Sequence, residues 1–467
     1  MINPWLERLI KLSKADSEDP VVQLIVQVQE GREQEVAAAL RRMGVRVVDV
    51  AGPFLLVSAR PSQAYDIARV PGVVSVSYNA PMWTMDLATG EYLKRVALRS
   101  DPLLSRLSRE QLAELGIELA ERPLGTGKFE VRRCGAVLVY NVEGCATVAT
   151  TRQVLRAPPL SQAELGRTKV GVIDTGVPPL HPAFRKGPFL EVSFVPEPPT
   201  DTMGHGTWCS TAAWGDPAPT AFGNFEPVAR APGQLFAMAK VFMAFGSTTD
   251  FLVIKAMDFL ARWGARVVSM SLGGPLQGSV DQDPASAAVA QYHRKYGTIF
   301  VVAAGNSGPQ EWTIASPGAS PYALTVGSVS YLDPSHVASY SSRGPNGAWY
   351  QGNRDAWEAD YEKYGDLIVK PDVTSPGGTV EYQVVAGVTP WYDGLYELAP
   401  PSGFDLMTGT SMATPQVAAL VSLALDRGLA SSLTELKERL RATSQGRKSV
   451  DSGWGLALWP RLAYGTY

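Results

Sequence analysis

The sequence predicts an α/β protein built on a parallel sheet with helices on both faces, preceded by a small α+β module. Two observations carry this prediction. From about residue 168 onward, segments that are apolar along their whole length alternate with longer segments of helical periodicity, a pattern typical of parallel strands joined by helical crossovers. Nearer the N-terminus, shorter segments follow the order β-α-β-β-α-β, which is the split βαβ arrangement of a small sheet with two helices.

The small module is predicted over residues 21–85, after a leader segment of residues 1–20. It opens with the apolar run VVQLIVQV, and the next segment repeats apolar residues at helical spacing, at Val36, Ala39, Leu40 and Met43. The runs VRVVDV and FLLVSAR, a helix that starts at a proline, and the run VVSVSYN complete the order. These elements predict a ferredoxin-like fold with both helices on one face of the sheet.

Residues 86–152 are interpreted as an insertion or linker that contains a helix and a β-hairpin. Ser108 followed by Gln111 forms a capping box at the start of the helix. The hairpin turn is predicted near residues 141–144. No function follows from this segment.

The larger domain is predicted over residues 153–467. Its strands are the runs KVGVIDTG, QLFAMAKVF, ARVVSMSLGG, GTIFVVAAGN and ALTVGSVS. The intervening segments FLVIKAMDFLARWG and ASAAVAQYHRKYG have helical periodicity, and the helix ATPQVAALVSLAL follows near the C-terminus.

The composition excludes several classes of protein. With 467 residues, 45% of them apolar and 19% charged, the chain can bury a large core and is not disordered. A net charge of -3 without a long basic run gives no electrostatic attraction to nucleic acid or an anionic membrane, so neither is an expected partner. No apolar stretch is long enough to predict a membrane span.

The N-terminal sequence and the cysteines predict a cytoplasmic protein, with non-classical export left open. Glu7, Arg8 and Lys11 interrupt the region where a signal peptide needs an unbroken apolar segment. Three cysteines cannot form a disulfide framework. Cys134 and Cys145 could still pair with each other.

Polar residues that follow apolar strands are the candidates for chemistry, because ligands bind at the carboxyl ends of parallel strands. Asp174 and Asn306 each follow such a strand, and His205 stands between glycines before a helix of small residues. Ser411 lies at the start of an apolar helix, where the helix dipole favours a developing negative charge. Singly, these are also ordinary capping, turn or structural residues. Together they supply a nucleophile, a base, an acid and an oxyanion donor.

The chain order Asp, His, Ser is that of subtilisin, not of chymotrypsin or the α/β-hydrolases. Four segments closely resemble motifs of subtilisin-like serine proteases, and the resemblance covers nearly everything from about 153 to 465: DTG at 174–176, HGT at 205–207, AAGNSG at 303–308 and GTSMATP at 409–415. It implies a subtilisin-like three-layer fold and a serine endopeptidase that acts on proteins or peptides. In this resemblance Ser411 attacks the peptide carbonyl, His205 moves the proton, Asp174 orients the imidazole, and Asn306 donates to the oxyanion.

The resemblance also implies how substrate is held. One wall of the main specificity pocket, which also pairs with the substrate backbone, would be Ser271, Leu272 and Gly273. The other wall would be Ala303, Ala304 and Gly305. Strand pairing makes recognition tolerant of sequence. The base of the pocket, near Ala315, has no charged residue, which favours apolar or aromatic side chains before the cleaved bond.

The module at 21–85 resembles the propeptide of this family, which covers the active-site cleft and assists folding. The resemblance implies that the N-terminal domain is an intramolecular inhibitor, whose last strand and following segment NAPMWTM lead into the cleft and are cut there by the enzyme itself. A separate binding domain of the same fold is the alternative. The stretch from Met85 to Asp174 is longer than the usual connection of the family, so the position of the cut stays open.

No cofactor requirement is predicted. The stretch GDPAPTAFGNFEP stands where the family often has a calcium loop, and it is short and proline-rich, so structural calcium is possible but unsupported. Cys209, four residues after His205, is interpreted as a small buried thiol, with a redox-sensitive or mercury-sensitive site as the alternative. The aromatic and acidic insertion at 346–369 either packs on the surface, borders the cleft or docks the module.

Three classes of function remain after these observations. The first is an active endopeptidase made as a self-inhibited precursor. The second is a catalytically silent binding or scaffold protein that retains the protease fold. The third is an esterase or other acyl hydrolase. The sequence counts against it, because the G-x-S-x-G elbow is missing and the order Asp, His, Ser differs from that of the α/β-hydrolases.

Overall fold

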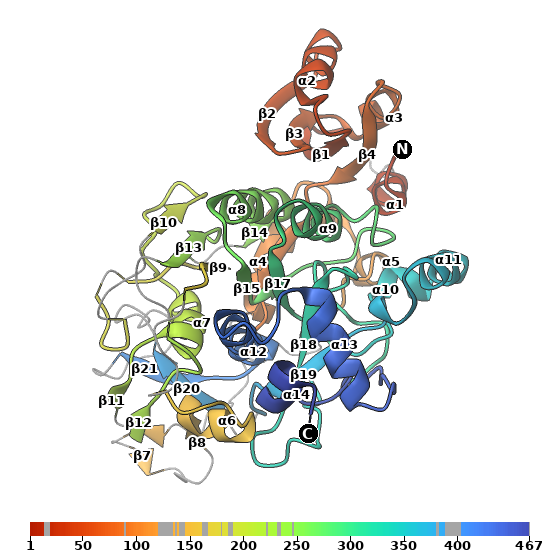
Figure 1. The fold of residues 1–467 in the computed structure, drawn as a ribbon. Helices are drawn as coiled ribbons and strands as arrows, with labels where there is room; N and C mark the ends of the chain where they lie inside the picture. The colour runs from red at the N-terminus through yellow and green to blue at the C-terminus, as the bar shows by residue number, and fades with distance from the viewer. Residues whose placement is uncertain are drawn as a thin grey trace.

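Seven parallel strands form the central sheet of the larger domain (Figure 1). Their order across the sheet is β10 (Leu190–Ser193), β13 (Phe236–Lys240), β9 (Val170–Asp174), β15 (Val267–Met270), β17 (Ile299–Ala303), β18 (Ala323–Val329) and β19 (Val373–Pro376). Every neighbouring pair is parallel. Apart from the edge strand β10, every residue of these strands is buried, as their unbroken apolar sequence requires.

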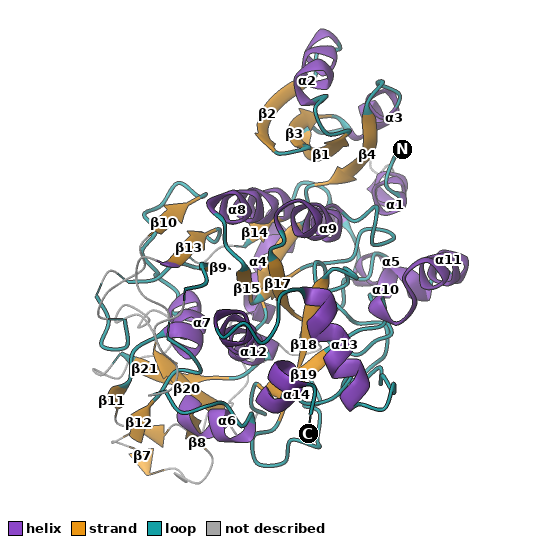
Figure 2. Cartoon of the chain, viewed as in Figure 1, coloured by secondary structure: helices purple, strands orange, loops and turns teal. Residues whose placement is uncertain are grey.

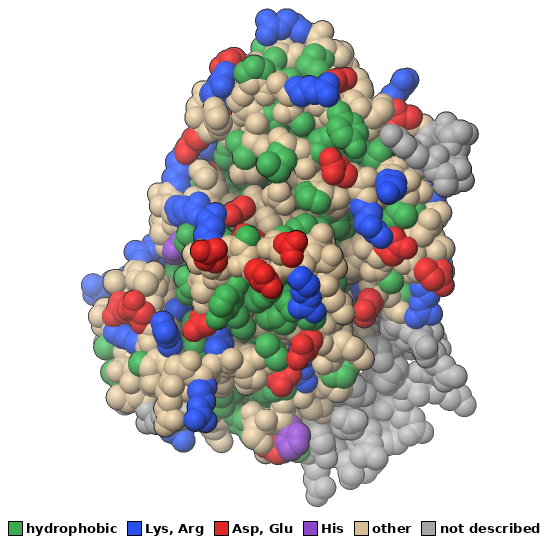
Figure 3. Space-filling model, turned by 90° about the vertical axis from the view of Figure 1, so that its right-hand side faces the viewer, with side chains coloured by type: hydrophobic (Ala, Val, Ile, Leu, Met, Phe, Trp, Pro, Cys, Tyr) green, Lys and Arg blue, Asp and Glu red, His purple; other side chains and the backbone are tan. Residues whose placement is uncertain are grey.

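The computed structural model describes residues 1–13, 19–87, 90–119, 134–135, 138–139, 145–160, 167–178, 180–184, 190–220, 223–230, 235–244, 247–379, 383–387 and 403–466. Among these residues no helix has the length and apolar character needed to cross a membrane. On the face shown in Figure 3, acidic and basic side chains are interspersed.

Helices cover both faces of the parallel sheet, which confirms the predicted three-layer fold (Figure 2). One face packs against α7 (His205–Trp214), α12 (Thr410–Asp426), α13 (Leu433–Thr443) and α14 (Trp459–Tyr464). The other face packs against α8 (Asp250–Trp263) and α9 (Pro284–Tyr296). Alternate strand residues serve the two cores: Val172 faces α7 and α12, whereas Ile173 faces α8 and α9.

The N-terminal module has the predicted β-α-β-β-α-β order. Its elements are β1 (Val22–Val28), α2 (Glu33–Arg42), β2 (Arg46–Ala51), β3 (Phe54–Ala59), α3 (Ala64–Ala68) and β4 (Val73–Tyr78), with the short 3-10 turn Pro61–Gln63 before α3. The strands form an antiparallel sheet in the order β2-β3-β1-β4. One face of this sheet shares a core with α2 and α3.

The other face of the module's sheet lies on α8 and α9 of the larger domain. Ile25, Phe54 and Leu56 belong to the same apolar core as those two helices. The ring of Phe54 lies 6.5 Å from that of Tyr292 in α9, and the Tyr292 hydroxyl donates a 3.3 Å hydrogen bond to a main-chain carbonyl of β2. The module is therefore docked through an apolar contact.

Two segments outside the predicted module join its core. Helix α1 (Pro4–Ser13), within the predicted leader, buries Trp5 and Leu6 there. After β5 (Pro81–Thr84), the chain forms α4 (Gly90–Ser100), the turn Leu104–Arg106 and α5 (Arg109–Glu114), and these also pack on the module. The Ser108–Gln111 capping box begins α5.

The predicted hairpin in residues 86–152 takes a different form. Strand β6 (Cys134–Gly135) pairs antiparallel with β7 (Leu138–Val139), and the predicted turn at 141–144 lies outside the described residues. Strand β8 (Cys145–Thr147) pairs instead with β20 (Gln383–Gly387), which also pairs with β21 (Phe404–Met407). The short apolar sequence of β8 does not indicate that its partner is β20, which is far away in sequence. The side chains of Cys134 and Cys145 are not among those described.

The remaining elements border these sheets. They are α6 (Val148–Val154), β11 (Ala218–Thr220) with β12 (Gly223–Phe225), β14 (Thr248–Thr249), β16 (Leu272–Gly273), and, in the 346–369 insertion, α10 (Ala348–Gln351), α11 (Arg354–Tyr364) and the turn Gly365–Leu367. In the insertion, Tyr350 is fully buried, and its hydroxyl accepts from Val280 N at 2.9 Å. The insertion thus packs through its aromatic side chains.

A buried carboxylate surrounded by three lysines stabilises the far end of the sheet. Asp372 accepts from Lys370 Nζ at 2.7 Å and Lys448 Nζ at 2.8 Å, and Lys437 Nζ lies 3.3 Å away. The Asp372 and Lys370 side chains are fully buried. Burial raises the pKa of Asp372, but the three ammonium groups outweigh it and hold that pKa far below its usual value.

We expect Asp372→Asn to lower the free energy of unfolding by about 3–5 kcal/mol, because it removes the only described carboxylate shown to contact Lys370, Lys437 and Lys448 together. Chemical denaturation at pH 7 measures this loss. Asp451→Asn, which changes an exposed carboxylate, serves as the control. A loss below about 1 kcal/mol would mean that the lysines do not depend on Asp372 for compensation.

Lys448 predicts a rise in stability at alkaline pH. Burial, opposed by the charge of Asp372, lowers the pKa of Lys448 from 10.5 to about 8. The unfolded chain therefore binds this proton more tightly, and the free energy of unfolding rises as the pH increases from about 8 to 10.5. The free energy of unfolding, measured by chemical denaturation at several pH values in this range, should rise less steeply with pH for Lys448→Met than for the wild type. Equal slopes would contradict the lowered pKa of Lys448.

Candidate active site

The four candidate residues for catalysis come together at the carboxyl edge of the parallel sheet. Asp174 is the last residue of β9, and Asn306 follows β17. His205 is the first residue of α7, and Ser411 is the second residue of α12. Both helices pack on the same face of the sheet, so their N-termini meet the strand ends.

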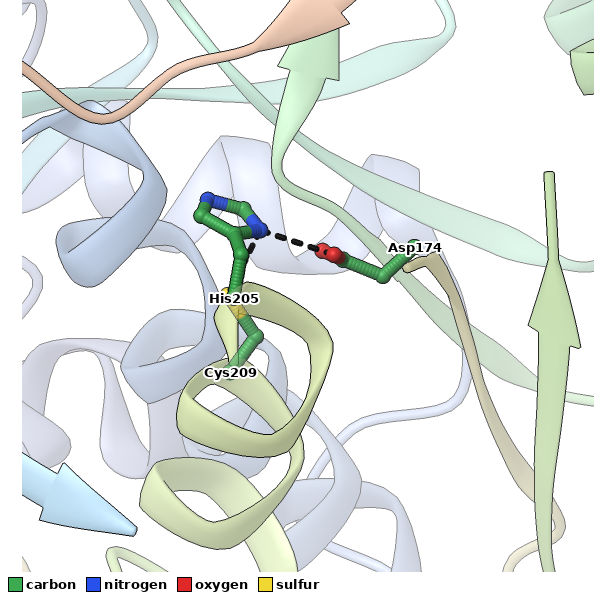
Figure 4. Close-up of side chains that lie close together, drawn as sticks. All are labelled: Asp174, His205 and Cys209. Carbon is green, nitrogen blue, oxygen red and sulfur yellow. Dashed lines mark hydrogen bonds and ion pairs between the residues drawn. The ribbon is translucent and has the colours of Figure 1, made fainter. Parts of the chain in front are cut away.

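Asp174 and His205 form a buried hydrogen-bonded pair. The distance from Asp174 Oδ1 to His205 Nδ1 is 2.7 Å, and both side chains are almost fully buried. Figure 4 shows the imidazole reaching from α7 toward the carboxylate, with Cys209 one turn further along the same helix. Burial alone lowers the pKa of His205, but Asp174 and the Cys209 sulfur outweigh it and raise that pKa well above its usual value.

Ser411 lies next to this pair without a hydrogen bond to it. Its Oγ donates instead to the carbonyl of Ser271 at 3.0 Å. Within the described residues, His205 Nε2 makes no hydrogen bond. Cys209 joins the two sides of the site, because its Sγ lies 3.9 Å from His205 Nδ1 and 3.7 Å from Ser411 O.

Part of the chain's own backbone crosses this site. We call residues 81–86 the cleft segment. Its strand β5 lies between β14 and β16 and is antiparallel to both. Leu272 pairs with Thr84 and Gly273 with Trp83, and Met85 N donates to Ser271 O at 3.2 Å. The cleft segment is therefore bound as an added strand, as extended peptides are bound by sheet edges.

The Met85 carbonyl ends at the N-terminus of α12. Ser411 N donates to Met85 O at 3.0 Å. Gly409 permits this approach, because a Cβ at that position would lie 2.3 Å from Met85 O and 2.8 Å from Asp86 Cα. The Met85–Asp86 peptide bond thus lies directly against the start of the helix that carries Ser411.

Asn306 supplies a second amide to the same place. Its Oδ1 accepts from Thr410 N at 3.0 Å and from Thr410 Oγ1 at 2.9 Å. Its Nδ2 is buried and has no hydrogen-bond partner among the described residues. A Cβ on Gly409 would lie 3.2 Å from this Nδ2. The amide nitrogen and Met85 O therefore lie beside the same glycine.

Among the predicted pocket residues, Gly273 lies against the side chain of Met85, and Gly305 lines one cavity together with Met85 and Ala315. A Cβ on Gly273 would lie 2.7 Å from Met85 Cε and 2.9 Å from the Cβ of Ala315. Ala315 N donates to Ala304 O at 2.9 Å, and Gly305 faces the same Ala315 Cβ from the other side. Ala303, the last residue of β17, is buried in the same apolar core as Met85 and Leu272. The small residues leave room for an unbranched apolar side chain.

Two residues of the site, Asp201 and Asp86, were not predicted. Asp201 accepts hydrogen bonds from Gly204 N, Thr207 N and Thr175 Oγ1, so it fixes α7 against the loop after β9. Asp201 stands four residues before the first residue of α7, and a carboxylate close to a helix start could have predicted this capping role. Met85 and Asp86 reach the site only through pairing with distant strands. Asp86 Oδ2 lies 3.9 Å from His205 Nε2 and accepts from Thr84 Oγ1 at 2.9 Å.

The site also contains the one cluster of metal-binding side-chain types in the described part of the chain. Asp174, His205 and Cys209 bring potential ligand atoms within 4.8 Å of one another. Their geometry is that of a hydrogen-bonded pair beside a thiol, because Asp174 Oδ1 and His205 Nδ1 already contact each other directly. Calcium is common in enzymes of the type that the motifs resemble, but we assign no calcium ligands here.

Comparison with known proteins identifies relatives of this chain. Pyrolysin of Pyrococcus furiosus is 34% identical over 202 residues, which cover 41% of this chain and 13% of pyrolysin. The serine protease AprX of Bacillus subtilis is 31% identical over 299 residues, covering 60% of this chain and 62% of AprX. The chain thus spans less than two thirds of the length of both.

The predicted cytoplasmic location is wrong. It is contradicted by the relatives, which are mostly secreted extracellular enzymes. One of them is named minor extracellular protease Vpr, from Bacillus subtilis, and is 34% identical over 168 residues, covering 34% of this chain and 20% of Vpr. The prediction failed because it relied on the missing signal-peptide pattern in the first residues.

A solved structure and a family model agree on the fold. The epidermin leader peptide processing serine protease EpiP from Staphylococcus aureus superposes with a TM-score of 0.57, covering 95% of this chain and 98% of that one. At 16% sequence identity this similarity concerns the fold alone. The model of the subtilase family matches residues 166–456, more than half of the chain. The chain belongs to the subtilase family.

Proposed function

We propose that the protein is a serine endopeptidase, made as a precursor that holds its own cleft segment in the active site. The observation that carries this proposal is the hydrogen bond of 3.0 Å from Ser411 N to Met85 O. A peptide carbonyl on an added strand, held against the N-terminus of a helix that starts with a serine, has the arrangement of a substrate before attack. The bond to be cut in the precursor is Met85–Asp86.

In the proposed mechanism, His205 Nε2 takes the proton of Ser411 Oγ while this oxygen attacks the substrate carbonyl. The Ser411 hydroxyl must first leave the Ser271 carbonyl, to which it is bound at 3.0 Å. Asp174 accepts a hydrogen bond from His205 Nδ1–H, which directs Nε2 toward the nucleophile and stabilises the imidazolium as it forms. The raised pKa of His205 fits this charge partner.

The oxyanion would be stabilised by Ser411 N–H, which already contacts Met85 O, and by Asn306 Nδ2. Because Thr410 N and Thr410 Oγ1 both donate to Asn306 Oδ1, the side-chain amide is held in one orientation, and within the described part of the chain its Nδ2 is free to donate to the oxyanion. His205 then transfers its proton to the leaving amine, which is Asp86 N in the precursor. Water hydrolyses the acyl-enzyme by the same steps in reverse order.

The same contacts support self-inhibition. The cleft segment fills the strand position that a substrate needs, and the N-terminal sheet packs on α8 and α9 through an apolar core. The side chain of Met85 contacts Gly273 and Ala315 at a pocket of small residues. We therefore propose that substrates carry an unbranched apolar residue, such as methionine, before the cleaved bond.

We expect Asn306→Ala to lower turnover of a peptide substrate by about 10²–10³, with little change in KM, because the amide is needed only in the transition state. Peptide hydrolysis at saturating substrate measures this. Asn353→Ala, which removes an exposed amide bound to Trp349 O, is the matched control. A change of less than fivefold for Asn306→Ala would remove this residue from the oxyanion site.

The proposed function is tested by labelling with a fluorophosphonate, which reacts with activated serines. Full-length protein, before and after mild proteolysis of its N-terminal region, is treated with the probe and mapped by mass spectrometry. The expected result is modification at Ser411, stronger after proteolysis, together with hydrolysis of peptides. Absence of label at Ser411 in every sample would reject the endopeptidase and leave a catalytically silent scaffold.

A further inference from the structure

The chain does not leave the active site after Asp86. Leu87 N donates to Thr408 O at 2.9 Å, and Gly90 N donates to Asp86 O at 3.2 Å, so both ends of this short connection stay beside the cleft segment. A Cβ on Gly90 would lie 2.5 Å from Thr84 O, which places the start of α4 against β5. We call residues 90–119, comprising α4, the turn after it and α5, the helical strap.

One face of the helical strap covers the cleft segment. Leu93 is buried in the same apolar core as Trp83 and Met85. Lys94 Nζ lies 5.3 Å from the centre of the Trp83 ring and donates to Glu118 O at 3.0 Å. Lys94 thereby joins the two ends of the strap across the outer side of the bound strand.

The other face of the helical strap belongs to the core of the N-terminal module. Its buried residues in that core are Leu98, Leu103, Leu104, Leu112, Leu115 and Ile117. Polar contacts fix the same interface: Trp5 Nε1 donates to Leu115 O at 2.8 Å, and the Tyr78 hydroxyl donates to Asp101 at 2.9 Å. The strap is therefore part of the module by packing, although it follows the Met85–Asp86 bond in sequence.

The end of the strap also contacts the larger domain. A Cβ on Gly116 would lie 3.0 Å from the Cβ of Ala348 in α10, and Figure 1 shows α5 beside α10. Glu118 and Leu119 line a groove whose opposite side is formed by residues 306–310. The strap thus bridges the module, the cleft segment and the 346–369 insertion.

We propose that the helical strap is a second inhibitory element, and that hydrolysis of Met85–Asp86 leaves the cleft closed until the strap has also left. This rests on the proposed function. Hydrolysis adds the OH of water to the Met85 carbonyl and a proton to Asp86 N, but it breaks none of the contacts of Leu98, Leu112 or Lys94. The strap remains covalently attached to the enzyme, so its effective concentration at the cleft stays high after the cut.

The test follows the full-length wild type over time. Denaturing intact-mass spectrometry records which bonds have been cut, size-exclusion chromatography records whether residues 1–85 remain bound, and hydrolysis of a methionine-containing peptide records activity. We expect chains cut only at Met85–Asp86 to retain residues 1–85 and to hydrolyse the peptide at least tenfold more slowly than chains that have also lost residues 86–119. Hydrolysis that rises in step with the first cut would overturn the proposal.

Two variants and a control assign the effect to the strap. Lys94→Ala removes the contacts with Trp83 and Glu118, and Leu98→Ala weakens the contact with the module. Each should shorten the lag between the first cut and full activity several-fold, whereas Arg99→Ala, on the exposed side of α4, should not. Thermal unfolding checks that the variants fold, and unchanged lags in both folded variants would overturn the proposal. Absence of any cut or serine labelling would instead reject the proposed function, and this proposal with it.

Discussion

Replacing Ser411 by alanine is expected to abolish both peptide hydrolysis and cleavage of the Met85–Asp86 bond. The expected loss is about 10⁶ in turnover, the size found when the nucleophile of subtilisin is removed. The physical reason is that no other described hydroxyl is placed both beside His205 and at the N-terminus of α12, where the Met85 carbonyl is held. Steady-state hydrolysis and intact-mass analysis of the purified variant measure the two activities.

This variant should stay folded, because the Ser411 main chain makes the contacts with Met85 and Ser271 that hold the segment in place. Ser335→Ala, at an exposed loop serine, is the control and should retain wild-type activity. Self-cleavage at an undiminished rate in Ser411→Ala would mean that another group, or a contaminating protease, performs the reaction.

Replacing Asp174 by asparagine is expected to lower turnover by about 10⁴, as the equivalent change does in the serine protease triad. The carboxylate accepts a hydrogen bond from His205 Nδ1–H, with 2.7 Å between Nδ1 and Asp174 Oδ1. An amide would donate to Nδ1 instead, leaving the proton on Nε2, where the base is needed. Turnover measured across pH would detect this change.

The pH profile gives the second readout of Asp174→Asn. In the wild type Asp174 raises the pKa of His205, and His205 must be neutral to act as a base, so hydrolysis should fall as the pH drops through that raised pKa. Without the carboxylate the acid limb of the profile should move to lower pH. Asp333→Asn, in the exposed Asp333–His336 pair, is the control, and an unshifted profile in Asp174→Asn would contradict the role of the buried pair.

The sequence could predict the fold class because both sheets have local signatures. Strands apolar on both faces indicated the parallel sheet, and alternating short elements indicated the module. The Asp174, His205, Asn306 and Ser411 motifs could be predicted for the same reason, since each combines a strand end or helix start with glycines or small residues. Their meeting at one edge of the sheet follows from the topology.

Other features had no local signature. The segment PMWT is only four residues long, and it becomes a strand by pairing with Thr248 and Leu272, far away in sequence. The sequence of the helical strap is amphipathic, but this pattern does not predict whether its apolar face packs on the N-terminal module or on the larger domain. Likewise, nothing near Lys448 in the sequence indicates that it reaches Asp372.

The most direct test of the account is to find which bond, if any, the purified wild-type chain cuts in itself. Intact-mass and N-terminal sequence analysis should find a new terminus beginning at Asp86, a fragment ending at Met85, and no cut in Ser411→Ala prepared in parallel. That result would establish that the carbonyl held by Ser411 N belongs to the peptide bond that is attacked. A wild-type chain that hydrolyses peptides while its Met85–Asp86 bond stays intact, or that cuts itself only elsewhere, would contradict it.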